Sequence, residues 1–279
     1  MKKIILLALL LLPPLYSAAD LQKGLDCYNK NDIDCAFKEW KPAADLGDVN
    51  AQLLLGTMYS GGQGIKQDYF KAVEYFKLAA DQGFAKAQYS LGVMYNDGQG
   101  VKQDYFKAVE YFKLAADQGF VNAQYALGDM YDDEDGVKQD YFKAVEYYKL
   151  AADQGFAIAQ NNLGVMYRNG EGVKQDYFKA VEYYKLAADQ GFAIAQNNLG
   201  VMYMNGEGVK QDYFKAIEYF KPAADQSFAK AQYNLGIMYE NGQGVKQDKR
   251  RAKQWFGKVC DNKIQRGCNS YKKLNEEGY

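Results

Sequence analysis

The residue types that enzymes use for catalysis are sparse in this sequence. It contains no histidine, so a relay between a nucleophile and its base would need lysine or a carboxylate. The spacing Ser-x-x-Lys occurs twice, from Ser227 to Lys230 and from Ser270 to Lys273. Serine enzymes that use this motif also carry Ser-Asp-Asn and Lys-Thr-Gly, and the sequence has neither of these companions. We therefore predict no catalytic residues.

One acidic run could bind a cation. The segment YDDEDG places Asp132, Asp133, Glu134 and Asp135 in one predicted loop, where another copy of the same segment reads YNDGQG. Carboxylate oxygens are ligands for hard cations, but the run lacks the spacing of a calcium-binding EF-hand loop. A solvated turn explains the run equally well. We predict no metal ligands and no cofactor, and keep a weak cation site as the alternative.

The first nineteen residues have the layout of a secretory signal peptide. Lys2 and Lys3 are followed by an apolar run and then by Ser17, Ala18 and Ala19. The run is shorter than the ~20 apolar residues of a transmembrane helix. We predict cleavage after Ala19, a periplasmic or secreted protein, and no integral membrane segment after cleavage. The remaining 32 basic and 35 acidic residues lack the basic excess of a nucleic-acid binder.

Most of the chain is a repeat that must position any functional side chain. A period of 36 residues runs without insertion from residue 48 to residue 263. It predicts six copies, at residues 48–83, 84–119, 120–155, 156–191, 192–227 and 228–263. A fixed period of this length is typical of stacked arrays. Residues 20–47 match a degenerate copy and residues 264–279 match a lone helix, so we expect both to cap the array.

Each copy has the pattern of two helices. Ala87, Leu91 and Met94 lie along one helical face. Gly98 can adopt the left-handed conformation that ends this helix, and Asp104 is a good N-cap for the next one. One such pair cannot bury its apolar face alone, so neighbouring copies must stack. The sequence therefore predicts an all-α protein built from helix-turn-helix units.

All four cysteines lie near the ends of the array, as Cys27 with Cys35 and Cys260 with Cys268. An even number of cysteines in an exported chain indicates disulfides. Four cysteines permit three pairings, but packed helices are ~8–10 Å apart, so stacked copies would hold the two ends too far apart to bridge. We predict the two local bridges. The lack of histidine argues against a metal site.

The repeat also resembles a known family. The spacing of Leu91, Gly92 and Tyr95, followed by Ala108 and Phe112, is similar to that of tetratricopeptide repeats, and the long turn ending in GVKQD resembles Sel1-like repeats. This resemblance implies a right-handed α-solenoid of stacked helix-turn-helix repeats whose first helices line a concave face. Cysteines eight residues apart are similar to those of Helicobacter cysteine-rich proteins. That similarity implies an alternative function, a β-lactamase or a peptidoglycan-related enzyme.

Corresponding positions of the first helices differ between copies. One column reads Leu53, Tyr89, Tyr125, Asn161, Asn197 and Tyr233, and the next reads Leu54, Ser90, Ala126, Asn162, Asn198 and Asn234. Tyr offers a large contact area, and Asn can bond a peptide backbone as donor and acceptor. We predict a monomeric, non-catalytic scaffold that binds a protein or peptide on the concave face through Tyr89, Tyr125, Asn161, Asn162, Asn197, Asn198, Tyr233 and Asn234. Packing between copies, or tolerance of change at the surface, is the alternative explanation of these columns.

Overall fold

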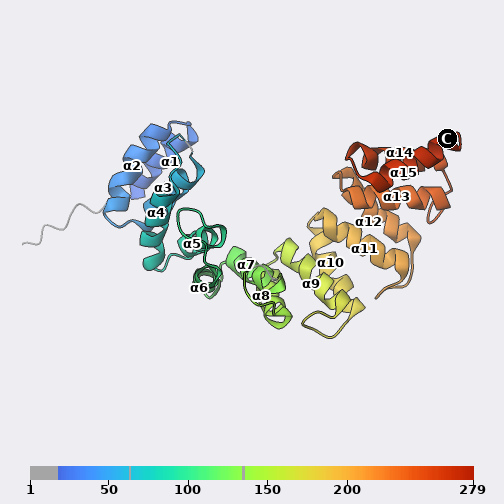
Figure 1. Cartoon of the computed structure of the whole chain (residues 1–279), viewed down its shortest axis with the longest axis horizontal. Coiled ribbons are helices and arrows are strands. Elements are labelled where there is room, and N and C mark those ends of the chain that lie inside the picture. The colour runs from blue at the N-terminus through green and yellow to red at the C-terminus, as the bar shows by residue number, and fades with distance from the viewer. Residues whose placement is uncertain (1–17, 63, 134–135) are drawn as a thin grey trace, which may run out of the picture. The chain divides into compact units, whose positions relative to one another are not determined.

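The computed structural model describes residues 18–62, 64–133 and 136–279 (Figure 1). In these ranges the chain forms fifteen helices and no strand, which confirms the predicted all-α class. The helices are α1 (Ala18–Asn29), α2 (Ile33–Asp45), α3 (Val49–Gly61), α4 (Tyr69–Asp81), α5 (Ala85–Asp97), α6 (Tyr105–Ala116), α7 (Val121–Asp132), α8 (Tyr141–Asp153), α9 (Ala157–Asn169), α10 (Tyr177–Asp189), α11 (Ala193–Asn205), α12 (Tyr213–Asp225), α13 (Ala229–Asn241), α14 (Lys249–Asp261) and α15 (Gln265–Glu276). Of the predicted signal peptide, residues 1–17 lie outside the described residues.

The chain divides into two compact units, residues 1–120 and residues 121–279. The first unit holds α1 to α6, and the second holds α7 to α15. Within each unit the helices pack in sequence order: α4 contacts α5 and α5 contacts α6, while α9 contacts α10 and α10 contacts α11. The predicted stack of helix-turn-helix units is therefore present in both units. None of the described helices is both long enough and apolar enough to cross a membrane.

The helix boundaries follow from capping residues at fixed places in the repeat. Gly98 ends α5 in the left-handed conformation, with a φ of 69°, and its N–H donates to the Met94 carbonyl. Asp104 begins α6, because its Oδ1 accepts a hydrogen bond from the backbone N–H of Lys107 at 3.1 Å. Both devices satisfy backbone groups that a helix end leaves without a partner. The loops that join α5 to α6, α9 to α10, α11 to α12 and α13 to α14 therefore have the same length.

Small residues let the two helices of a repeat approach closely. Ala87, Leu91 and Ala108 are completely buried, and Phe112 is 3% exposed. Gly92 faces the Phe112 ring so closely that a Cβ atom there would lie 2.6 Å from Cδ1. Atoms of a close-packed interior cannot approach to that distance, so the glycine sets the spacing between α5 and α6.

A buried glutamine in the first helix of each repeat joins successive helices. We call Gln52, Gln88, Gln124, Gln160, Gln196 and Gln232 the glutamine ladder; each is 3–7% exposed. The Nε2 of Gln88 donates to the Ala80 carbonyl of α4 at 3.3 Å, and its Oε1 accepts from the Gln118 Nε2 after α6 at 2.7 Å. Buried amides need such partners, because an unsatisfied polar group in the interior is costly. The ladder therefore fixes the register of one repeat on the next within each unit.

Candidate functional site

The tyrosines predicted to bind a partner are partly buried packing residues. The Tyr89 ring centre lies 5.5 Å from that of Phe112 and 5.3 Å from that of Phe120. Tyr125 packs in the same way against Tyr148 at 5.9 Å, as its counterpart in the second unit. Aromatic rings whose centres are this far apart attract each other and contribute to packing in a protein interior. The tyrosines therefore present only part of each ring to a partner.

The predicted asparagines form contacts between successive repeats. Asn161 and Asn197 are 6% and 5% exposed, so the structure places them in the interior. The Asn198 Nδ2 donates to the Asn161 Oδ1 at 3.0 Å, and the Asn234 Nδ2 donates to the Asn197 Oδ1 at 3.0 Å. The structure thus assigns Asn161 and Asn197 to packing between repeats and leaves Asn162, Asn198 and Asn234 partly exposed.

The first repeat of the second unit contains a network of polar side chains. The Tyr148 hydroxyl donates to the Asp132 Oδ2 at 3.3 Å, and burial of Tyr148 raises the pKa of that phenol, which also bonds Asn162. Burial raises the pKa of Asp132, with smaller repulsive contributions from other acidic groups. The pKa of Tyr125 is raised to about 12, because the hydroxyl is partly buried and lies beside Asp129. The network is held together by protonated hydroxyl groups at neutral pH.

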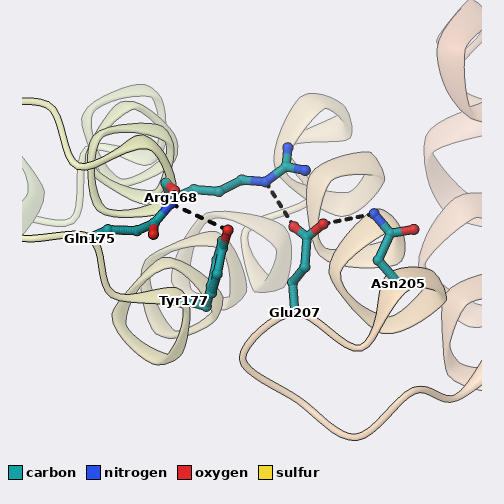
Figure 2. Close-up of polar contacts among 5 residues, drawn as sticks. All are labelled: Arg168, Gln175, Tyr177, Asn205 and Glu207. Carbon is teal, nitrogen blue, oxygen red and sulfur yellow. Dashed lines mark hydrogen bonds and ion pairs between the residues drawn. The ribbon is translucent and has the colours of Figure 1, made fainter.

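One repeat further, an ion pair joins two repeats (Figure 2). The Arg168 Nε lies 3.0 Å from the Glu207 Oε2, and the Asn205 Nδ2 donates to the Glu207 Oε1 at 2.9 Å. On the other side, the Gln175 Nε2 donates to the Arg168 carbonyl at 2.9 Å and to the Tyr177 hydroxyl at 3.2 Å. The Arg168 and Glu207 side chains are 34% and 26% exposed, so screening by solvent limits the stability that this ion pair adds.

The residues of these two networks vary together along the chain. Tyr148 and Tyr184 stand where Phe76, Phe112 and Phe220 stand in other repeats. Sixteen residues before each of the two tyrosines the sequence has a charged residue, Asp132 or Arg168. Arg168 bonds the hydroxyl of Tyr184, whose pKa burial raises to about 12. A comparison of the copies could have suggested both pairings, although the charged residue alone is not a sufficient signal, because Glu240 stands sixteen residues before Phe256.

The acidic run is only partly described, and one of the two Ser-x-x-Lys motifs begins in a turn. Asp132 and Asp133 are described, whereas Glu134 and Asp135 lie outside the described residues. No group of three potential metal ligands comes together in the described part of the chain. Ser227 has a φ of 64° in the turn before α13, the place of a glycine in other copies, so its role is that of a turn residue.

Both cysteine pairs lie at disulfide distance. The Cα atoms are 5.7 Å apart in the pair Cys27 and Cys35, and 4.4 Å apart in the pair Cys260 and Cys268. Cys268 takes the position of Gln232 in the glutamine ladder, and Cys260 takes that of the alanine whose carbonyl the glutamine bonds. The C-terminal disulfide therefore replaces a ladder hydrogen bond by a covalent link between α14 and α15.

The structure also shows an exposed aromatic residue that the sequence analysis did not single out. The second residue of five second helices is a phenylalanine, and each of these side chains is 72–79% exposed. We call Phe70, Phe106, Phe142, Phe178 and Phe214 the phenylalanine row. Apolar spacing alone could not separate these residues from the core. Their helical position, opposite Ala180 and Tyr184 in the case of Phe178, was the available signal.

Comparison with known proteins agrees with this geometry. The chain belongs to the Sel1 repeat family, which matches residues 49–84, 85–120, 121–156, 157–192, 193–228 and 229–263. These matches begin one residue after the copies defined from the sequence. No functionally curated protein matches the sequence.

Two solved structures are similar over most of the chain. One is c5321, a protective antigen of uropathogenic Escherichia coli, with 36% identity, a TM-score of 0.88, and coverage of 94% of this chain and 57% of that chain. Another is a Sel1 repeat protein from Oxalobacter formigenes, with 28% identity, a TM-score of 0.75, and coverage of 87% and 97%. Helicobacter pylori cysteine rich protein B is 26% identical, with a TM-score of 0.38 and coverage of 48% and 96%. The chain thus spans little more than half the length of c5321.

Proposed function

We propose that this chain is an exported, non-catalytic scaffold that binds a protein or peptide on the exposed face of its first helices. The Sel1 repeat fold supports this proposal, because arrays of helix pairs present extended binding surfaces. Each first helix is held by the core and by the glutamine ladder, so its outer side chains stand on a rigid support. Rigid support reduces the ordering cost of binding.

The proposal rests on one observation about the first helices: an outer position varies among the six copies, whereas the packing positions are identical. One first-helix position, exposed in five copies and partly exposed in the third, reads Asn50, Lys86, Asn122, Ile158, Ile194 and Lys230. Packing residues of the same helices, such as Ala159 and Leu163, are identical in all six copies. Positions that change while their framework stays constant suit a surface that is specific for one partner.

The second unit offers the more apolar part of this face. Ile158 and Ile194 are 37% and 41% exposed, and each lies one helical turn from a partly exposed asparagine, Asn162 or Asn198. The isoleucines can bury apolar area against a partner, and the asparagine amides can bond its backbone. This arrangement fits a peptide segment that carries apolar side chains, in an extended or helical conformation.

The proposal also includes export of the chain and capping of both ends of the array. Two disulfides are compatible with an oxidising compartment such as the periplasm or the cell exterior. We infer that residues 1–19 are removed on export, and that residues 20–47 and 264–279 cap the array. Both disulfides lie in or beside these end segments, where an array is most liable to open.

The test is affinity capture by the chain that begins at Asp20. A variant with Ile158→Ser and Ile194→Ser should lose the captured partner. The matched control carries Leu150→Ser and Leu186→Ser, because these leucines are 44% and 46% exposed on second helices of the same unit. Capture that survives the isoleucine changes, or that is lost equally in the leucine control, would contradict a binding site on the first-helix face.

A further inference from the structure

The phenylalanine row is the most exposed aromatic feature of the described chain. In the second unit Phe142, Phe178 and Phe214 are 78%, 77% and 72% exposed. Each is the second residue of its helix, in α8, α10 and α12. Equal positions in stacked repeats lie on the same edge of the stack, so the three rings form a line of protruding apolar groups.

Packing within the fold does not explain why these residues are unchanged. A side chain with three-quarters of its surface exposed contributes little to a core. Apolar groups that gather on one part of a protein surface mark protein or membrane interaction sites, whereas isolated ones do not. The corresponding first-helix residues Lys86, Asn122 and Ile158, which are exposed or partly exposed, differ between repeats. Exposed residues of the same second helices, such as Glu182 and Lys185, are equally unchanged. The exposure and the regular placing of the rings, and not their identity among copies, therefore indicate a shared role.

Two lysines accompany each phenylalanine. Lys174 and Lys179 line an open pocket of about 630 Å³ together with Phe178, and Lys210 and Lys215 line the corresponding pocket of about 610 Å³ with Phe214. Each pocket lies where the loop of one repeat meets the glycine of the next. The cations thus lie beside the apolar rings in both repeats.

The nearest acidic groups only partly balance these lysines. The Asp176 Oδ1 accepts the backbone N–H groups of Phe178 and Lys179, at 3.0 and 3.1 Å, and so serves as the helix cap. Glu207 of the following loop is paired with Arg168. Beside Phe142, the Lys143 Nζ lies 3.2 Å from the Asp140 Oδ2. The Nζ atoms of Lys179 and Lys215 lie over the Tyr167 and Tyr203 rings, at 5.0 and 5.2 Å from the ring centres. The row therefore combines protruding rings with partly engaged lysines, a combination that suits an apolar phase bordered by anions.

A second copy of the chain fits this edge poorly. Two copies facing each other through their phenylalanine rows would bring Lys179 against the equivalent lysine, and like charges at an interface oppose association. The rings also protrude from the surface, so a folded partner would need a matching cavity for each one. A lipid surface needs no matched cavities, because its acyl chains adapt to the inserted group.

We propose that the phenylalanine row of the second unit docks the protein on an anionic lipid surface. Phe142, Phe178 and Phe214 insert at the level of the acyl boundary, and the lysines beside them contact lipid phosphates. This surface is separate from the first-helix face, so the scaffold could hold its partner while it lies on a membrane.

The experiment is vesicle co-sedimentation of the chain that begins at Asp20. Vesicles of phosphatidylcholine with phosphatidylglycerol are compared with vesicles of phosphatidylcholine alone. The key variant carries Phe142→Ser, Phe178→Ser and Phe214→Ser, and the control carries Ile158→Ser and Ile194→Ser. The melting temperature of each variant is measured first, and we expect little change because the substituted side chains are exposed.

We expect binding to the anionic vesicles that weakens as salt rises, because the lysine contribution is screened. Each phenylalanine removed should lower the partition coefficient by roughly tenfold, whereas the isoleucine control should bind like the wild type. Equal binding of the wild type and the triple variant, equal binding to both kinds of vesicle, or release by inorganic phosphate at constant ionic strength would overturn the proposal. It would also be overturned if the triple variant lost a captured protein but kept its vesicle binding, since the row would then be a protein interface.

Discussion

The buried Oε1 of Gln232 lacks the hydrogen bond that its counterparts in the glutamine ladder accept, because Asn262 stands where the other repeats have a glutamine. In the preceding repeat the Gln226 Nε2 donates to the Gln196 Oε1 at 3.1 Å. The shorter Asn262 donates to the Lys258 carbonyl instead, at 3.2 Å, and the Gln232 Oε1 has no partner within the described chain. The last repeat therefore contains a correctable defect.

Asn262→Gln should repair this defect. The longer side chain can reach Gln232, and a restored buried hydrogen bond adds about 1 kcal/mol to the free energy of unfolding. Urea denaturation should show a higher midpoint for the variant. Gln226→Asn is the reciprocal change, and it should lower the midpoint by a similar amount. An unchanged midpoint in both variants would show that the ladder contributes nothing to stability.

Gly92→Ala should destabilise the first unit. Its Cβ would lie 2.6 Å from the Phe112 ring, so α5 and α6 must move apart or the ring must leave its position. Overpacking of this kind costs roughly 1–3 kcal/mol. Thermal melting measures the loss, with Ser90→Ala as the control on the partly exposed face of the same helix. If the two alanine variants melt alike, the close approach is not required.

Asp132→Asn should stabilise the protein at neutral pH. Burial raises the pKa of Asp132 in the folded state, so the folded chain binds this proton more tightly than the unfolded chain. The stabilising contribution of the protonated form is fully present below the unfolded pKa and is lost as the pH rises through the folded pKa. The amide of the variant still accepts the Tyr148 hydrogen bond. Melting temperatures should therefore differ at pH 7 and converge near pH 4, and a constant difference would contradict this assignment.

The C-terminal disulfide can be tested against the hydrogen bond that it replaces. Cys260→Ala with Cys268→Ala should release α15, at a cost of about 2–3 kcal/mol. Cys260→Ala with Cys268→Gln rebuilds the ladder pair and should recover about 1 kcal/mol of this loss. Hydrogen exchange of the α15 amides reports both effects. Equal exchange in the two variants would show that Gln and Ala are equivalent at this position.

Export makes a prediction about covalent structure. Protein recovered from the periplasm or the medium should begin at Asp20, and both cysteine pairs should be oxidised. Mass analysis of the intact chain and of non-reduced peptides measures both. A chain that keeps residues 1–19, or a peptide linking Cys27 to Cys260, would be incompatible with the proposed processing and pairing.

The periodic part of the fold was predictable because one physical cause sets each recurring residue. Asp104 and Gly98 set the helix ends, and Ala87 and Leu91 set the buried face, so their spacing alone indicates paired helices. The candidate site was less predictable. Asn161 and Asn198 belong to adjacent columns of the sequence, but the packing of successive helices decides that Asn161 is buried and accepts a hydrogen bond from Asn198. Phe178 was missed because its aromatic side chain suggested the core, although its helical position opposite Ala180 and Tyr184 indicated the exposed side.

The glutamine ladder also bears on how such a gene can change in length. Within a unit, each rung joins a glutamine to the carbonyl eight residues before it, as Gln160 does with Ala152 and Gln196 with Ala188. If recombination between near-identical copies removed residues 157–192, Gln196 would meet Ala152 in the geometry that Gln160 leaves. Unequal crossing-over could therefore shorten or lengthen the array by whole repeats without creating an unfamiliar junction.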